Sequence, residues 1–317
     1  MSIFRASPHG GTDRPADITL MTMAAEFDFI KWIIAQHRAD DFVRVPPGDD
    51  LAVLNWPAND LLLVGVDQVM DGVHFDSRVH SPEQIGRKVM NRNLSDCAAM
   101  ACLPAAAVAT VALPRGAGEA YAQGLYRGMS QAGSRFDCRI VGGDTASWDG
   151  KLVMTVSILG RSAGIAPVTR AGACVGDGIY VTGPLGGSIL GRHMDFEPRV
   201  HLARKLASSH RLTAMIDISD GLSRDLRHIT DLSHVAAELS ASSVPIHADA
   251  QRLSAQDHKP ALWHALHDGE DHELLFTSPD APDGMIRIGT VTRGQSIFIT
   301  DPTGRRELEE QGWQHSL

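Results

Sequence analysis

Apolar positions recur along the chain in two rhythms, one typical of helices and one typical of strands. From residue 26 onward, four apolar residues and a histidine follow helical spacing: Phe27, Ile30, Ile33, Ile34 and His37. Two longer helical patterns run from Pro82 to Cys102 and from Gly116 to Gly133. Ser81 is a candidate N-cap for the first of these helices, since serine side chains accept from the first free backbone amides. Pro82 then stands in the first helical turn, where proline is tolerated.

Short apolar runs between these helices predict strands. In the first half they are LAVL (51–54), LLLVGV (61–66), AAVATVAL (106–113) and KLVMTVSILG (151–160). In the second half we expect strands at 178–183, 214–219, 235–240, 272–277, 285–291 and 297–299, and helices at 185–193, 198–208, 220–232 and before 272. Strands that alternate with helices predict a mixed α/β (α+β) protein.

The length of 317 residues favours two domains. Residues 1–23 are polar and contain Pro, Gly and Thr, which predicts a loose N-terminal tail. The stretch 161–178 resembles a linker, so the expected domains are 24–162 and 163–317.

Composition excludes several classes of protein. With 43% hydrophobic and 21% charged residues, the chain is neither disordered nor a coiled coil as a whole. A formal charge of -9 argues against nucleic acid or an anionic membrane as the main partner. No secretory or spanning segment is apparent, and the four cysteines show no metal-ligand spacing. We therefore expect reduced, mostly buried thiols in a cytoplasmic protein.

Acidic residues recur beside glycines or at expected strand ends. The segments are PPGDD (46–50), GVDQVMDGVHF (65–75), NLSD (93–96), VGGD (141–144), IDISDG (216–221) and DGED (268–271). Any one of them is most simply a turn, and Asp220 could be a helix N-cap. Asp96 differs, because it lies in an otherwise apolar helix and needs a partner there. Converging carboxylates would repel one another unless divalent cations neutralised them, which suggests Mg²⁺ with a phosphorylated ligand.

Other catalytic motifs are absent. The chain has no GxxxxGK[ST], the glycines of TGPLGGS (182–188) do not make GxGxxG, and no GxSxG occurs. In HELLF (272–276), Phe276 stands where a zinc protease needs its second histidine.

The order and content of these segments resemble the thiamine-monophosphate kinase family, which is related to aminoimidazole ribonucleotide synthetase. The matching segments include GDDLAVL, NLSDCAAMACLP, VGGDTASWDG, AMIDISDGLSRDLRHI and GEDHELLFT, from about residue 25 to the C-terminus. The resemblance implies a two-domain fold whose N-terminal strands form a barrel across a homodimer. It implies ATP-dependent phosphorylation of thiamine monophosphate with Mg²⁺, in an ATP- and Mg²⁺-binding N-terminal domain followed by an α/β domain.

The resemblance also assigns residues to roles. It implies metal ligands at Asp50, Asp67, Asp96, Asp144, Asp217 and Asp220. Nucleotide contacts fall on Gly143, Asp144, Arg170 and Ser219, and substrate contacts on His74, Glu270 and Trp313. No catalytic base is expected, because the acceptor is already an ionised phosphate.

The chain departs from the family pattern at several positions. Gly65 and Val66 stand where the family usually has a serine or threonine before the metal-binding aspartate, and a water could fill the vacant place. Asp71, Asp268 and His272 replace a glutamate, a glycine and a tyrosine of the family. Two alternatives follow, namely a related kinase with another phosphorylated substrate and an inactive nucleotide- or metal-binding relative.

Overall fold

The computed structural model describes residues 28–48 and 51–313. Its first unit is a four-stranded sheet with the order β3-β6-β4-β5. The strands are β3 (Leu62–Met70), β4 (Leu103–Pro114), β5 (Arg139–Trp148) and β6 (Val153–Arg161). β6 pairs antiparallel with β3 and β4, whereas β5 runs parallel to β4. β3 and β5 are thus opposite edges, three strand spacings or about 14 Å apart.

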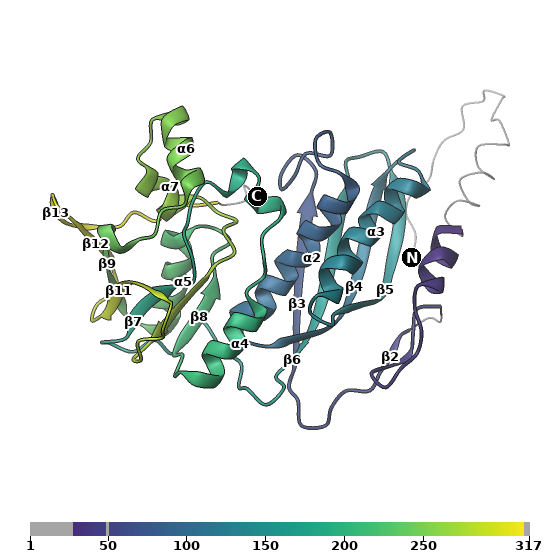
Figure 1. The fold of residues 1–317 in the computed structure, drawn as a ribbon, viewed down its shortest axis with the longest axis horizontal. Coiled ribbons are helices and arrows are strands. Elements are labelled where there is room, and N and C mark those ends of the chain that lie inside the picture. The colour runs from purple at the N-terminus through teal and green to yellow at the C-terminus, as the bar shows by residue number, and fades with distance from the viewer. Residues whose placement is uncertain (1–27, 49–50, 314–317) are drawn as a thin grey trace, which may run out of the picture.

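Helices α2 (Pro82–Ala99) and α3 (Glu119–Ser134) lie side by side across one face of this sheet (Figure 1). The predicted cap at Ser81 is confirmed: the Gln84 amide donates to Ser81 Oγ at 3.2 Å, and the Ser81 amide donates to the Gln84 side chain at 2.8 Å. The two helix backbones approach closely, because a Cβ on Gly86 would lie 2.0 Å from the Leu125 carbonyl oxygen. This contact fixes α2, which supplies much of the site described below.

The other face of the sheet exposes several apolar side chains among polar ones and is only partly covered. A two-stranded sheet of β1 (Val43–Val45) and β2 (Val53–Leu54) packs on it through Val43, which contacts Ala106 and Val141. Val64 and Val66 remain 68% and 64% exposed. We call this uncovered part the outer face; it consists of Leu62, Val64, Val66, Val108 and Trp148.

A second sheet of seven strands has the order β13-β12-β9-β11-β7-β10-β8. Its strands are β7 (Gly178–Val181), β8 (Ala214–Asp217), β9 (Ala236–Ser240), β10 (Leu274–Ser278), β11 (Ile286–Thr292), β12 (Ile297–Asp301) and β13 (Gly304–Glu307). Four helices accompany it: α4 (Val200–Ser209), α5 (Leu222–Ser233), α6 (Ala248–Asp257) and α7 (Ala261–His267). One buried cluster joins Leu94 of α2 to Phe276 of β10, so the two units share apolar packing.

Most predicted elements are present, but the helix expected at 185–193 is wrong. That segment forms two short 3-10 turns, Ser188–Leu190 and Arg192–Met194. Gly186, Gly187 and Gly191 have φ angles of +90°, +76° and +135°, which interrupt a helix. A third short turn, Ala241–Ser243, follows β9.

Three strands were not predicted: β1, β5 and the last strand, β13. The glycines of VGGD suggest a turn, but they lie within β5. A Cβ on Gly143 would lie 2.0 Å from the Ala109 carbonyl oxygen, so close strand pairing explains this glycine.

Within the ranges that the structure describes, no helix is long and apolar enough to cross a membrane. Cys97, Cys102 and Cys138 are buried and Cys174 is exposed, all as free thiols, as expected. The mixed α/β class is confirmed. The domain boundary at 162 and the barrel across a dimer stay predictions, and the predicted tail (1–23) lies outside the described residues.

Candidate functional site

On its side facing β3, helix α2 neutralises two carboxylates with its own cations. Arg92 Nε donates to Asp67 Oδ2 at 2.5 Å and Nη2 donates to Oδ1 at 3.2 Å. The same guanidinium reaches Glu270 through Nη1 at 2.9 Å. Burial works to lower the pKa of Arg92, but the carboxylates of Asp67 and Glu270 outweigh it and raise the pKa. Arg92 therefore stays charged and links a strand of the first unit to a loop of the second.

Lys88, one helical turn before Arg92, strengthens this link. Its side chain is fully buried, and Nζ lies 2.8 Å from Glu270 Oε1. Nζ also donates to the His74 carbonyl oxygen at 2.6 Å. Burial would raise the pKa of Glu270, but Lys88 and Arg92 hold it below its ordinary value. His74 and Glu270, two predicted substrate contacts, are thus positioned by one lysine.

On its side facing β8, α2 meets carboxylates that have no such cation. Ser95 Oγ donates to Asp217 Oδ2 at 2.7 Å, and His272 Nδ1 lies 3.2 Å from the same oxygen. Burial raises the pKa of Asp96 to about 8, assisted by the nearby charges of Asp217 and Asp67 and opposed by Arg92 and Arg170. Among the described residues, no lysine or arginine pairs with Asp96 or Asp217. This side holds an excess of negative charge that an added cation could neutralise.

Asp220 extends this acidic side after β8. Burial raises its pKa. Oxygen and nitrogen atoms of Asp220, Asp225 and His228 lie within 4.8 Å of one another, a separation that could hold a metal ion. Asp225 Oδ2 also accepts from the backbone amides of Asp220 and Gly221, at 3.1 Å each, so Asp225 shapes the turn that presents Asp220.

The structure shows what surrounds the residues at which this chain departs from the family pattern. A Cβ on Gly65 would lie 3.9 Å from Asp96 Oδ2, whereas Val66 lies on the outer face, opposite to Asp67. Asp71 Oδ2 accepts from Ser77 Oγ at 2.6 Å. Asp268 Oδ2 accepts from the Gly187 amide at 2.8 Å. A hydroxyl missing from residue 65, rather than from residue 66, is therefore the one that would have reached the acidic side.

A cavity of about 600 Å³ opens beside this cluster, and we call it the polar cavity because most of the residues that line it are charged or polar. It brings together five of the residues implied by the resemblance, from both units of the chain: His74, Ser219, Asp220, Glu270 and Trp313. Trp313 is half-exposed, and its backbone amide donates to the Asp220 carbonyl oxygen at 3.1 Å. Trp263 and Arg224 add an aromatic ring and a positive charge to the wall.

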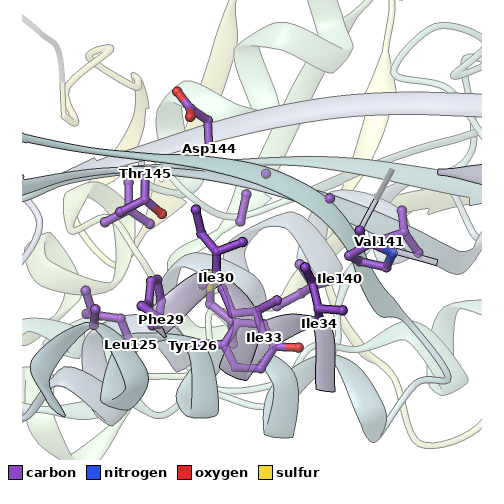
Figure 2. Close-up of a pocket in the computed structure, with 18 of the residues that line it drawn as sticks. Phe29, Ile30, Ile33, Ile34, Leu125, Tyr126, Ile140, Val141, Asp144 and Thr145 are labelled. Atoms are coloured by element: carbon purple, nitrogen blue, oxygen red, sulfur yellow. The ribbon is translucent and has the colours of Figure 1, made fainter. Parts of the chain in front are cut away.

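A second cavity, of about 500 Å³, is mainly apolar (Figure 2). Helical residues 28–35, α3 and strands β4 and β5 form its walls, and Gly143 lies along its edge. Figure 2 shows Asp144 projecting from the opposite side of the sheet to Phe29, Ile30 and Tyr126. Asp144 pairs in register with Thr110 on β4, so two strands separate it from β3.

The structure thus gathers some of the predicted residues and separates others. Asp67, Asp96, Asp217 and Asp220 lie around α2 and β8, and Arg170 is near enough to influence Asp96. Within one chain, Gly143 and Asp144 do not join them, and Asp50 lies outside the described residues. The assigned roles stay predictions.

Sequence reasoning missed Lys88, Arg92 and Ser95, which contact the predicted residues directly. A signal was available, because Lys88, Arg92 and Asp96 follow one another at intervals of four and therefore share one face of the helix.

Comparison with known proteins finds similar sequences that are thiamine-monophosphate kinases. The family profile described as "AIR synthase related protein, N-terminal domain" matches residues 48–162. A thiamine-monophosphate kinase of Rhodopirellula baltica is 40% identical over 308 residues, which cover 92% of this chain and 97% of that protein. The thiamine-monophosphate kinase of Bacillus subtilis is 32% identical over 327 residues, covering 92% and 99%.

Solved structures show the same similarity. Thiamine-monophosphate kinase from Stenotrophomonas maltophilia is 31% identical, with a TM-score of 0.72 over 87% of this chain and 95% of that one. The structure named "AaThiL complexed with AMPPCP and TMP" is 28% identical, with a TM-score of 0.74 over 97% and 100%. The hydrogenase maturation protein HypE, at 16% identity and a TM-score of 0.72, shares the fold alone.

Proposed function

Because the chain belongs to the thiamine-monophosphate kinase family, we propose that it transfers the terminal phosphoryl group of ATP to thiamine monophosphate. The bond to the β-phosphate oxygen of ATP breaks, and a bond to a phosphate oxygen of the acceptor forms, giving ADP and thiamine diphosphate. The observation that supports this function best is the polar cavity, which joins His74, Glu270 and Trp313 to Asp220.

The residues of the polar cavity have distinct roles in this proposal. The half-exposed ring of Trp313 stacks on the aromatic part of the acceptor. His74 and Glu270, both held by Lys88, orient the acceptor. No general base is needed, since the attacking phosphate oxygen is already ionised near neutral pH.

Asp96, Asp217 and Asp220 fit a site for Mg²⁺. They offer hard oxygen ligands, and burial, assisted by the charges of Asp217 and Asp67, raises the pKa of Asp96 to about 8, so a bound cation would favour its ionised form. Bound at these carboxylates, Mg²⁺ would neutralise phosphate oxygens during transfer. The chain's own contribution is to hold Asp217 in place through Ser95 and His272.

The apolar cavity suits the base of ATP, since its walls are aliphatic and aromatic and the glycine backbone at Gly143 permits close approach. In one chain, however, this cavity borders β5 and the acidic cluster borders β3, on opposite edges of the sheet. A complete site therefore needs β5 of one copy beside β3 of another.

A homodimer would supply that arrangement. The outer face, formed by Leu62, Val64, Val66, Val108 and Trp148, exposes apolar side chains that a second sheet would cover. Light scattering at micromolar concentration should give twice the mass of one chain. Val64→Asp should shift the protein to a monomer, whereas Leu232→Asp, at an exposed apolar residue of α5, should not. A monomeric wild-type protein would overturn the dimer.

The direct test of function is incubation with ATP, Mg²⁺ and thiamine monophosphate, followed by detection of thiamine diphosphate. Product formation with equal release of ADP is expected. If the ATP analogue AMPPCP binds but no thiamine diphosphate forms, the chain is an inactive relative or uses another acceptor.

A further inference from the structure

The surroundings of Asp67 do not fit a divalent cation, although the resemblance implies a metal ligand there. Both carboxylate oxygens of Asp67 already accept hydrogen bonds from Arg92, at 2.5 and 3.2 Å. Residue 65, on the same face of the strand, is glycine and offers no side-chain oxygen. Val66 lies on the outer face and has no oxygen in its side chain. Mg²⁺ needs near-octahedral oxygen ligands at about 2.0–2.1 Å, and the guanidinium fills the space in which they would have to converge.

Arg92 is well suited to remain in that place. Its side chain is 15% exposed, and the planar guanidinium matches the carboxylate with two donors. A third donor reaches Glu270 at 2.9 Å, so the position of the guanidinium is defined from two directions. A flexible surface arginine that only happened to lie near Asp67 would not show this second anchor.

We propose that Arg92 takes the place of one divalent cation at Asp67, and that it ties Asp67 to the substrate contact Glu270. The inference deepens the proposed function, on which it rests for the role of Glu270. Asp67 is then a positioning residue that acts through Arg92, while the divalent cations belong to the side of α2 that faces β8.

Metal counting tests this assignment without any turnover. The full chain is titrated with Mn²⁺ in the presence of AMPPCP, and bound ions per chain are counted by electron paramagnetic resonance. Asp67→Asn should keep the wild-type number of ions, with affinities changed less than twofold. Loss of one ion in Asp67→Asn, or a tenfold weaker affinity, would overturn the proposal.

Asp217→Asn serves as the positive control, since it should lose Mn²⁺. If Asp217→Asn and Asp67→Asn both keep every ion, the metal assignment of the proposed function fails while the assignment of Asp67 stands. If only Asp67→Asn loses an ion, this inference fails and the proposed kinase does not.

The reciprocal variant is Arg92→Met, which removes the cation but keeps an unbranched side chain. Because Arg92 contacts the carboxylates of both Asp67 and Glu270, its removal leaves two oxygen ligands facing one place, so Arg92→Met should bind one more Mn²⁺ ion per chain than the wild type. The double variant Asp67→Asn with Arg92→Met should lose that ion again. Arg87→Met is the matched control on the same helix, because Arg87 pairs with Asp195 at 2.8 Å instead of with Asp67 or Glu270, and it should add no ion. An unchanged count in folded Arg92→Met would contradict the proposal, and if that variant does not fold, the count in Asp67→Asn still decides.

Kinetics gives a second readout. Asp67→Asn loosens Arg92 and thereby Glu270, so KM for thiamine monophosphate should rise about threefold to tenfold, while the Mg²⁺ concentration for half-maximal rate stays within twofold. A metal ligand would show the reverse, a higher Mg²⁺ requirement with an unchanged KM, and that result would rule out the positioning role.

Discussion

Along one face of helix α2, the contacts with β3 and the contacts with β8 treat carboxylates in different ways. Toward β3, Asp67 and Glu270 pair with Arg92 and Lys88, so their charges are balanced when the chain folds. Toward β8, Asp217 accepts from Ser95 and lies beside His272, and among the described residues neither Asp217 nor Asp96 pairs with a lysine or an arginine. Glu270 and Asp96 thus end in opposite electrostatic states: the pKa of Glu270 is lowered by its cations, whereas the pKa of Asp96 is raised, mainly by burial.

The difference separates structural charges from functional ones. A buried ion pair stabilises its surroundings only while both partners are present. A buried carboxylate without a cation destabilises the empty protein, and a bound cation then relieves that cost. The side facing β3 should therefore be sensitive to loss of a protein charge, and the side facing β8 to the presence of metal. Three changes, at Lys88, Asp96 and Ser95, test this contrast, and a fourth, at Trp313, tests the polar cavity outside it.

The largest effect is expected at Lys88. Lys88→Met removes the fully buried ammonium that contacts Glu270 and the His74 carbonyl. Because the substitution leaves the buried carboxylate of Glu270 without its lysine, it should lower the free energy of unfolding by about 3–5 kcal/mol. Urea denaturation measures this value.

Arg87→Met is the control for Lys88→Met, since its pair with Asp195 is largely exposed. Arg87→Met should lower the free energy of unfolding by less than about 1 kcal/mol. Equal losses in the two variants would show that the side facing β3 has no special dependence on its cations.

In EDTA, which removes divalent cations, Asp96→Asn should raise the free energy of unfolding, whereas Lys88→Met should lower it. The pKa of Asp96 is about 8 in the folded protein against an ordinary 3.8, so the folded state holds its proton more tightly. Between pH 4 and 8 the wild type therefore loses stability as the pH rises, by up to about 1.4 kcal/mol per unit, and the asparagine variant does not. At pH 8 the variant should be more stable by several kcal/mol.

Asp231→Asn, at an exposed aspartate of α5, controls for the removal of a charge and should show the wild-type pH profile. Adding Mg²⁺ with AMPPCP should stabilise the wild type more than Asp96→Asn. Parallel pH profiles for Asp96→Asn and the wild type would contradict the excess of charge on the side facing β8.

The sequence predicted the acidic residues near β8, but it did not predict the ion pairs near β3. Asp217 and Asp220 follow a short apolar run, which predicts a strand end and places them correctly near Asp96. The local pattern also predicts α2 and its cap, because helical spacing and capping are properties of neighbouring residues. The pairing of Arg92 with Asp67 joins residues 25 positions apart, and that with Glu270 joins residues 178 apart. Such contacts depend on packing that no local pattern contains.

The glycines of β5 show the same limit. Gly142 and Gly143 indicate a turn when read alone, and only the neighbouring strand β4 explains why glycine is needed at 143. Missing β5 also hid the separation of Asp144 from the other acidic residues. The family resemblance supplied the list of residues, but the structure shows which of them one chain can bring together.

The polar cavity provides a test outside α2. Trp313→Ala removes the half-exposed ring beside Asp220 without touching either side of the helix. KM for thiamine monophosphate should rise about thirtyfold, or about 2 kcal/mol of lost stacking, by analogy with base–aromatic stacking. KM for ATP and the Mg²⁺ requirement should stay within twofold. An equal rise in both KM values would show that the ring supports the fold and not the acceptor.

The smallest change examines how the side facing β8 prepares for metal. Ser95 Oγ donates to Asp217 Oδ2 at 2.7 Å in a buried setting, which fixes the direction of the carboxylate. Ser95→Ala keeps the helix and removes that donor, so Asp217 must be oriented by His272 alone. Groups that orient a metal ligand typically contribute tenfold or more to metal affinity, so the Mg²⁺ concentration for half-maximal rate should rise about tenfold. Ser134→Ala, at an exposed serine of α3, should leave the titration unchanged. If Ser95→Ala instead lowers stability in EDTA and leaves the Mg²⁺ titration unchanged, then the side facing β8 is a structural polar network like the side facing β3, and the contrast between them disappears.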